Sequence, residues 1–381
     1  MLTAYRTPGV YFEWLDKPPE LAGVRTDIAG FVGIAERGPL FEPQKVESWA
    51  QFVSIFGDHI AQGYLAYAVA GFFANGGLTC WVVRVADDFM VDFAGLSLVS
   101  GETVVRLQAR TPGSWGQNLA AIVKRSLNGR FTLTLQLPGG AQEVWRDVTI
   151  TNPDEPRYLP DVLNDNLLGS RFVRAIVEEE TAVLPQLPLA DLEFVASRFA
   201  YLATTGADPD GLEHLRPEHF LRGLDKLEEV DEVSMIAIPD VMPKPVVPVR
   251  YKPPDPRCHV LEERPLPPPP QPEIIFPRPF DADEIEAVQQ AMIRHCHKLK
   301  DRVVILDSRI GDLEPTAVLN WRRRFDSKYA TLYYPWLLVP DPLRLEGLVR
   351  PIPPSGHVAG IFARVDRQVG VHKPPANEPF T

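Results

Sequence analysis

Five segments between residues 233 and 338 constrain the fold most, because strand-like and helix-like patterns alternate there. Short apolar runs at Val233–Ile238, Val303–Leu306 and Tyr329–Leu338 have the length and the side chains of buried strands. The stretches between them, from Asp281 to about Lys300 and from about Thr316 to Phe325, predict helices. The order strand, helix, strand, helix, strand indicates a mostly parallel sheet with helices on its faces.

The N-terminal part of the chain has the same character. Ile28–Ala35 is a continuous apolar run with two glycines and predicts a buried strand. Ser48 is a good N-cap for a short helix. Tyr64–Ala74 is apolar all round, which predicts a buried helix, and Cys80–Val85 predicts the next strand. This part therefore predicts the start of an α/β layer.

The pattern changes between residues 87 and 190, where short alternating segments are separated by Gly, Pro and Asn turns. We interpret this region as an all-β insertion, and we expect the α/β pattern to return around Leu192–Leu202. An amphipathic helix is predicted at Pro217–Val230. The predicted strands of the insertion are Thr103–Ala109, Leu119–Lys124, Phe131–Leu137, Glu143–Val148 and Phe172–Val177.

Residues 1–20 contain a short strand-like segment bracketed by prolines. Val10, Phe12 and Trp14 would share one face of this strand. Two interpretations are open: an edge strand of its own domain, or a strand donated to the sheet edge of a neighbour. The residues alone favour the first.

Two further segments are unusual in composition. Fourteen of the 39 prolines fall between Pro243 and Pro279, which excludes a regular element and favours polyproline II. Near the C-terminus, a proline-glycine turn at Pro353–Gly356 precedes a small-residue segment, His357–Val365. Its glycines and alanines would let a neighbouring element approach closely.

Length and charge bound the class of protein. A chain of 381 residues predicts two domains or three. A net charge of −11 argues against nucleic acid or an anionic membrane as the main partner. Cys80, Cys258 and Cys296 lack metal-site spacing and are expected to be reduced thiols. We expect neither a signal peptide nor a transmembrane helix.

Fragments that look like binding sites have simpler interpretations. The loop Thr204–Gly211 lacks the spacing of a phosphate or calcium loop, so we predict a structural role. His295 and His297 lie two positions apart on a predicted helix, point in different directions and cannot share one metal ion. Trp115 is predicted to be a packed anchor.

A serine hydrolase is the enzymatic alternative. Asp307 and Ser308 after a predicted strand, with Ser355 and His357 later, offer the residue types of a Ser/His/Asp set. No G-x-S-x-G motif accompanies them, so the sequence predicts no catalytic residue, no cofactor and no metal site. This profile favours a subunit of an assembly.

An ordered series of motifs resembles the contractile tail sheath family, which comprises phage tail sheaths and the sheaths of related injection systems. The resemblance covers nearly the whole chain, and its most specific block combines two segments, SWAQFVSIFG and YLAYAVAGFFANGGLTCWVVRV. The matching segments are Thr7–Tyr11, Val24–Pro39, Ser48–Gly57, Tyr64–Val85, Pro112–Leu119, Val230–Asp240, Lys300–Asp307 and Tyr334–Asn377.

The resemblance implies a fold and a function. The fold would be a subtilisin-like α/β domain that is not a protease, with an inserted, outward-facing β domain. Subunits would stack as hexameric rings around an inner tube and contract to drive the tube through a target envelope. Implied partners are further copies of the chain, the inner tube protein, baseplate and cap proteins, and a second sheath subunit, without nucleic acid or membrane insertion.

The resemblance also implies that terminal arms enter neighbouring subunits, which reverses our preference for residues 1–20. The expected arm residues are Pro8, Gly9, Val10, Tyr11, Phe12 and Trp14, with a hinge at Pro18 and Pro19.

The expected domain division follows from these segments. Residues 1–22 would be the arm, 23–88 the first part of the α/β domain, 89–190 the β insertion, and 191–381 the rest, interrupted at 243–279. Family members continue beyond the PAN motif into a C-terminal domain, so we expect that domain to be largely absent here. A low-copy subunit at the baseplate or cap is therefore an alternative. We expect assembly in the bacterial cytoplasm, followed by residence in a phage tail or injection particle.

Overall fold

The structure is a computed structural model of the chain. It describes residues 25–126, 130–138, 140–178, 184–189, 197–242, 268–270, 274–343 and 348–381. The expected arm, its hinge and most of the proline-rich stretch 243–279 lie outside the described residues.

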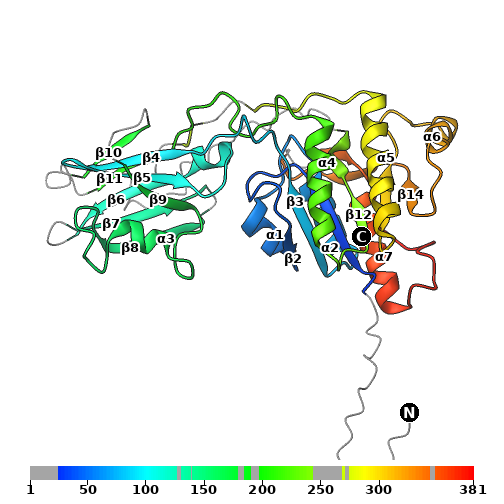
Figure 1. Cartoon of the computed structure of the whole chain (residues 1–381), viewed down its shortest axis with the longest axis horizontal. Coiled ribbons are helices and arrows are strands. Elements are labelled where there is room, and N and C mark those ends of the chain that lie inside the picture. Colours follow the sequence, from blue (N-terminus) through cyan, green and yellow to red (C-terminus); the bar gives the residue numbers. More distant parts are fainter. Residues whose placement is uncertain are drawn as a thin grey trace, which may run out of the picture.

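A six-stranded sheet forms the centre of one part of the molecule, with the strand order β14-β13-β12-β1-β3-β2 (Figure 1). All neighbouring pairs are parallel except β2 with β3. The predicted parallel arrangement is confirmed. The strands are β1 Ile28–Gly33, β2 Gln44–Val46, β3 Thr79–Arg84, β12 Met235–Ala237, β13 Val303–Asp307 and β14 Ala330–Tyr333.

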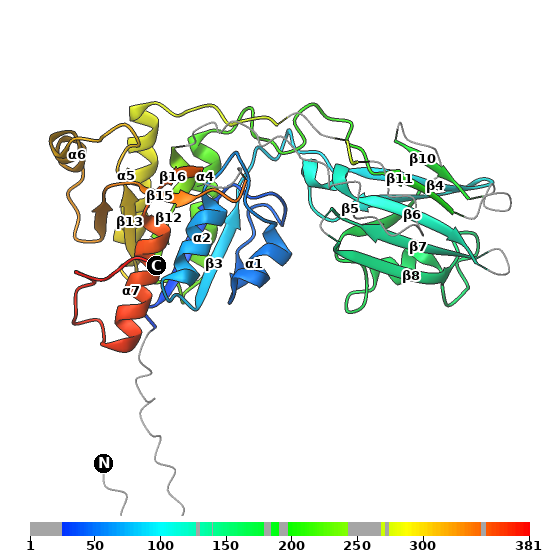
Figure 2. The same cartoon turned by 180° about the vertical axis from the view of Figure 1, so that it is seen from behind.

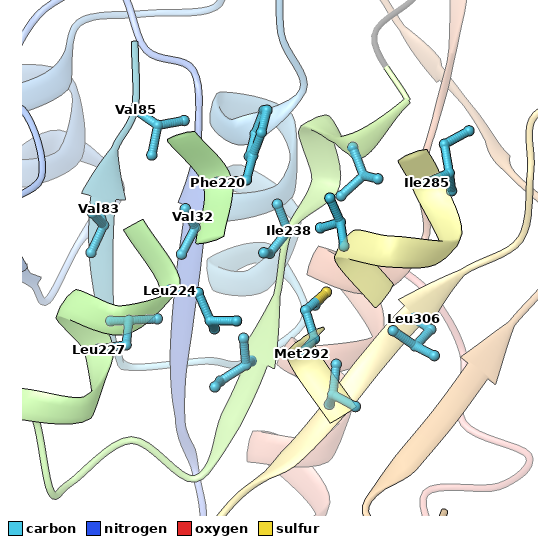
Figure 3. Packing of buried hydrophobic residues seen from close by; sticks show 14 of the residues in the cluster. Val32, Val83, Val85, Phe220, Leu224, Leu227, Ile238, Ile285, Met292 and Leu306 are labelled. Atoms are coloured by element: carbon cyan, nitrogen blue, oxygen red, sulfur yellow. The ribbon is translucent and has the colours of Figure 1, made fainter. Parts of the chain in front are cut away.

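Helices cover both faces of this sheet because alternate strand residues point to opposite sides. Val32, Val83 and Leu306 pack against α4 and α5 on one face (Figure 3). Phe31 and Val82 pack against α1, α2 and α7 on the other face (Figure 2). The helices are α1 Trp49–Phe56, α2 Leu65–Ala74, α4 Pro217–Lys226, α5 Ala282–Leu299, α6 Pro315–Arg322 and α7 Ser355–Gln368.

The helix ends follow the signals in the sequence. Ser48 caps α1, because its hydroxyl oxygen accepts a hydrogen bond from the Gln51 amide at 3.2 Å. Asp281 and Glu284 form a reciprocal capping box at the start of α5. These caps confirm the predicted starts of both helices.

The other part of the molecule consists of two four-stranded sheets, with the orders β10-β4-β5-β9 and β11-β6-β7-β8 (Figure 1). Their facing side chains form a separate core around Trp115 and Leu133. The elements are β4 Gly95–Ser100, β5 Thr103–Ala109, β6 Ala120–Arg125, β7 Phe131–Gln136, β8 Gln142–Val148, α3 Leu159–Asn164, β9 Val173–Glu178, β10 Gln186–Pro188 and β11 Ser197–Tyr201.

One expectation for this region is wrong. The α/β pattern does not return around Leu192–Leu202, because β11 pairs antiparallel with β6 and so belongs to a β sheet. The physical reason is that a strand's partner lies far away in the sequence. Local alternation shows that a strand forms but not which sheet it joins.

The segment from Tyr329 to Val365 also differs from expectation. The single predicted strand Tyr329–Leu338 is divided, because Pro335 lacks the amide that would continue the ladder. β14 ends at Tyr333, and a separate hairpin follows, formed by β15 Leu337–Pro340 and β16 Val349–Ile352. The small-residue segment His357–Val365 lies inside α7. Among the described residues, no helix is both long and apolar enough to cross a membrane.

Candidate functional site

Ligands of open α/β sheets bind at the carboxyl edge of the parallel strands. Asp240 lies in the short turn Pro239–Val241 after β12, and Asp307 is the last residue of β13. Both carboxylates are buried, with 0% and 4% of each residue exposed. Buried acids at this edge either face a substrate or bind the chain itself.

Asp240 ties two neighbouring elements together. Its carboxylate accepts hydrogen bonds from the amide of Ile34 at 2.7 Å and from the amide of Tyr64, at the start of α2. Gly33 and Gly63 leave room for it, because a Cβ on either glycine would lie 2.3 and 3.1 Å from its oxygens. Burial raises the pKa of Asp240 to about 6, although these amide donors oppose the shift.

Asp307 has the equivalent role for α7. Its Oδ1 accepts a hydrogen bond from the amide of Ser355, the first residue of that helix, at 2.9 Å. A carboxylate at a helix N-terminus is favoured by the helix dipole and by the unpaired amides there. Burial raises the pKa of Asp307 to about 7. Both acids therefore bind helix starts.

A buried arginine joins the β15–β16 hairpin to this edge. The Arg350 guanidinium donates to the carbonyl oxygens of Ile60 at 2.9 Å and Ala61 at 2.8 Å. It also lies over the rings of Tyr64 and Tyr67, at 4.7 and 4.8 Å from their centroids. Stacking and hydrogen bonding together hold the hairpin against the start of α2.

Two further contacts close the edge. The Tyr67 hydroxyl donates to Asp341 at 2.6 Å, and the Trp336 indole donates to the carbonyl oxygen of Ser308 at 2.7 Å. The Trp336 ring also meets Tyr64 edge-on, with 5.5 Å between ring centroids. The chain's own side chains therefore fill the place where an α/β enzyme would bind its substrate.

The Ser/His/Asp residues of the hydrolase alternative do not form a catalytic set. Ser308 and Ser355 each expose 0% of their surface, so neither hydroxyl can reach a substrate. Asp307 contacts the Ser355 amide, and among the described residues no histidine is hydrogen-bonded to it. The His357 ring lies against Gly71 on α2, where an added Cβ would come within 2.2 Å of Nδ1. A triad needs a base in contact with an accessible nucleophile, and these residues provide neither.

The residues of metal-ligand type are either dispersed or already in contact with other groups of the chain. On α5, His295 and Cys296 are buried, whereas His297 is exposed and contacts Ser327. Asp87, Asp88 and His219 place ligand atoms within 4.8 Å of one another. Asp88 pairs with Arg222 at 2.8 Å, and His219 accepts from the Arg216 amide at 3.0 Å. These contacts secure the start of α4.

Polar contacts join the central sheet to the β-rich part. Arg84 is buried at the end of β3 and donates to the carbonyl oxygens of Gly38 at 2.9 Å and Pro112 at 3.0 Å. Asp210, in the predicted structural loop, accepts from the Ser114 amide at 2.8 Å. Trp115 is 4% exposed, which confirms the predicted packed anchor.

The sequence did not single out Asp240, Arg350 or Asp341 as residues of the site. Asp240 ends the segment Val230–Asp240 and Arg350 lies within Tyr334–Asn377, so both belong to segments that carry the resemblance. Their partners lie 176 to 290 residues away, beyond the reach of any local pattern.

No family model matches this chain, and no curated protein matches it. Among the solved structures to which it is similar are tail sheath proteins and sheaths of contractile injection systems.

Three of these structures illustrate the similarity. The sheath tail protein of Desulfitobacterium hafniense is 12% identical, with 92% of this chain and 60% of that chain covered and a TM-score of 0.47. A sheath tail protein of Listeria innocua is 13% identical, with 90% and 56% covered and a TM-score of 0.49. The contracted helical sheath of the anti-feeding prophage is 16% identical, with 99% and 57% covered and a TM-score of 0.42.

The chain thus spans 60% or less of the length of these solved proteins. With TM-scores below 0.5, its function has to be argued from its own residues.

Proposed function

We propose that this chain is a structural, non-enzymatic subunit of a contractile sheath. It would polymerise as stacked hexameric rings around an inner tube and contract to drive that tube through a target envelope. The observation that carries the proposal is the ordered series of sheath-like motifs, which runs from Thr7 to Asn377.

The positions of these motifs support a mechanical role. Asp240, Asp307 and Arg350 belong to three different motif segments, and all three bind backbone groups around the carboxyl edge. Such contacts lock strands, helices and hairpin into one body. A subunit that rotates as a rigid body during contraction needs this stiffness, whereas an enzyme needs the same edge open.

The proposed domain division assigns each part a task. Residues 23–88 and the part of 191–381 that follows β11 would form the subtilisin-like sheath domain. Residues 89–190, together with β11, would face outward, and 243–279 would be a surface excursion. Residues 1–22 would be the arm, with Val10, Phe12 and Trp14 added to a neighbour's sheet and Pro18 and Pro19 as the hinge. Ladder hydrogen bonds would keep subunits joined while the hinge bends.

The proposed partners are copies of the chain itself, the inner tube protein, baseplate and cap proteins, and a second sheath subunit. Assembly would occur in the bacterial cytoplasm, before the particle acts as a phage tail or an injection system.

Copy number in the native particle tests this proposal. We expect quantitative mass spectrometry of purified particles to find this chain and the inner tube protein in comparable amounts. A few copies per particle would instead assign the chain to the baseplate or cap, and its absence from particles would contradict a sheath role altogether.

A further inference from the structure

Two adjacent leucines project from the β-rich part of the molecule. Leu167 and Leu168 expose 93% and 81% of their surface, immediately after α3. Single exposed leucines are ordinary on protein surfaces. Two neighbours at one turn need an explanation if the turn that presents them is rigid.

This turn, which we call the leucine tip (residues 165–169), is tied at both ends. Oδ1 of Asp165 accepts hydrogen bonds from the amides of Leu167 at 2.8 Å and Leu168 at 2.7 Å. The Arg110 guanidinium donates to the carbonyl oxygen of Leu163 at 3.2 Å and to that of Ser170. Because the backbone is already ordered, docking the leucines would lose little conformational entropy.

The leucine tip also carries negative charge. Amides of the turn lower the pKa of Asp165, so its carboxylate stays ionised, and the carboxylate of Asp161 is exposed nearby. An anionic lipid surface would repel these groups. The chemistry fits an apolar groove with a cation at its rim.

The same chain contains such a groove beside the amino ends of β12 and β13. Its volume is about 350 Å³. A cavity of ~150 Å³ accommodates one benzene-sized group, so this groove has room for two leucine side chains. Its apolar lining comes from Met235, Val303, Tyr329, Phe362 and Val371.

Lys300 supplies the cation at the rim. It ends α5 in the left-handed conformation, with φ of 62°, and lines the groove. Within the part of the chain that the structure describes, its ammonium group forms no ion pair. Two neighbouring cations are already engaged, Arg302 with Asp301 and Lys373 with Glu378. The carboxylate of Asp366, which also lines the groove, is hydrogen-bonded to the Thr26 side chain. Lys300 is therefore the lining cation available to a carboxylate of the leucine tip.

The leucine tip and the groove lie in different parts of the molecule. Figures 1 and 2 both show α3 among the β sheets and α7, whose Phe362 lines the groove, on the central sheet. A contact between them therefore joins two copies through different surfaces, and such head-to-tail contacts build rings or helical polymers. We propose that the leucine tip of one copy inserts into the groove of a second copy.

This contact rests on the self-assembly in the proposed function and names the two surfaces through which the copies meet. Cysteine cross-linking tests directly whether these surfaces meet. One chain carries Leu168→Cys and the other Val371→Cys, both with Cys258→Ser, while Cys80 and Cys296 are buried. Under mild oxidation of the assembled chains, we expect disulfide-linked dimers in the mixture and none from either variant alone.

Two cross-linking results would overturn the proposal. Dimers of the Leu168→Cys variant alone would mean that tip meets tip. Absence of cross-links in assembled mixtures would mean that the groove has another occupant or none.

A second measurement tests the energetics without cysteines. Leu167→Ser with Leu168→Ser should weaken self-association at least tenfold in sedimentation velocity, because two buried leucines would be lost from the contact. Leu319→Ser is the matched control, since Leu319 on α6 is 55% exposed and lies outside both surfaces. Lys300→Asp should weaken association, and Asp161→Lys in the partner copy should restore it.

The outcomes separate this contact from the proposed function. If the serine variant still assembles into sheath as the parent chain does, the contact is wrong and the sheath role stands. If the parent chain does not join the particle, the sheath role is wrong, and the contact, which rests on that role, is wrong as well.

Discussion

Gly356 on α7 lies directly against the backbone of Ala68 on α2. A Cβ added to Gly356 would lie 2.3 Å from the carbonyl oxygen of Ala68 and 2.4 Å from its Cα. Gly360 makes the same kind of approach one turn later, to the carbonyl oxygen of Phe72 at 2.5 Å. Both helices start at the carboxyl edge, so this contact positions the elements that Asp240 and Asp307 bind.

We therefore expect Gly356→Ala to destabilise the fold. The added methyl group meets backbone and not the flexible end of a side chain, so the two helices must separate, at a cost of about 1 to 3 kcal/mol. Urea unfolding followed by circular dichroism measures this. Gly311→Ala is the control, because the site has nothing within 4 Å, and equal effects of both changes would refute the close approach.

The Arg350 network gives a second prediction. Arg350→Met removes the donors to the carbonyl oxygens of Ile60 and Ala61 and leaves both without a partner. An unpaired buried group costs about 1 to 3 kcal/mol, and these two contacts are partly buried. We expect the free energy of unfolding to fall by about 2 kcal/mol. Arg294→Met is the control, because Arg294 lies on the exposed surface of α5. This change should alter the free energy of unfolding by less than about 0.5 kcal/mol.

The dependence of stability on pH follows from Asp307. Burial raises its folded-state pKa to about 7, whereas the unfolded side chain titrates near ~3.9. The folded chain therefore holds the extra proton between these values. This group's contribution to the unfolding free energy is fully present below about pH 4 and declines as the pH rises through 7.

Asp307→Asn tests this sign, because asparagine keeps an oxygen for the Ser355 amide and does not titrate. Unfolding free energies at pH 5 and pH 8 should differ less in the variant than in the parent, by up to ~1.4 kcal/mol per pH unit. Asp240, whose pKa burial raises to about 6, contributes in the same direction. Either of two results would exclude this role for Asp307. One is a parent chain that gains stability between pH 5 and pH 8, and the other is a variant whose unfolding free energy depends on pH in the same way as that of the parent.

The buried serines give a prediction about chemistry. A fluorophosphonate probe labels serine hydrolases only where the hydroxyl is accessible and activated. Ser308 and Ser355 are fully buried, so we expect no labelling of the native protein. Labelling that disappears in Ser308→Ala or Ser355→Ala would revive the hydrolase alternative.

Local patterns were sufficient for most strands of the central sheet and for its helices other than α7. Val303–Leu306 and the capping residues Ser48 and Asp281 carry their signal within a few residues, so their roles were predictable. The partner of β11 and the side-chain hydrogen bonds of Arg350 depend on residues 73 to 290 positions away, which no window along the chain contains. The sequence did not predict α7, because its small residues indicate a close contact between elements and do not form the apolar stripe of an amphipathic helix.

The expected arm lies outside the described residues and stays a prediction. Deleting residues 1–16 should leave a folded monomer, with unchanged circular dichroism and melting temperature, and should abolish sheath assembly. Replacing Val10, Phe12 and Trp14 with serine separates side-chain contacts from arm length. Normal assembly of both variants would refute strand donation.

Electron cryomicroscopy of the native particle would show whether this chain forms the sheath layer. We expect density for the six-stranded sheet, the buried carboxyl edge and the β-rich part in every ring of the layer around the inner tube. A sheath layer built from a different chain, with this one absent from it, would refute the proposed sheath role.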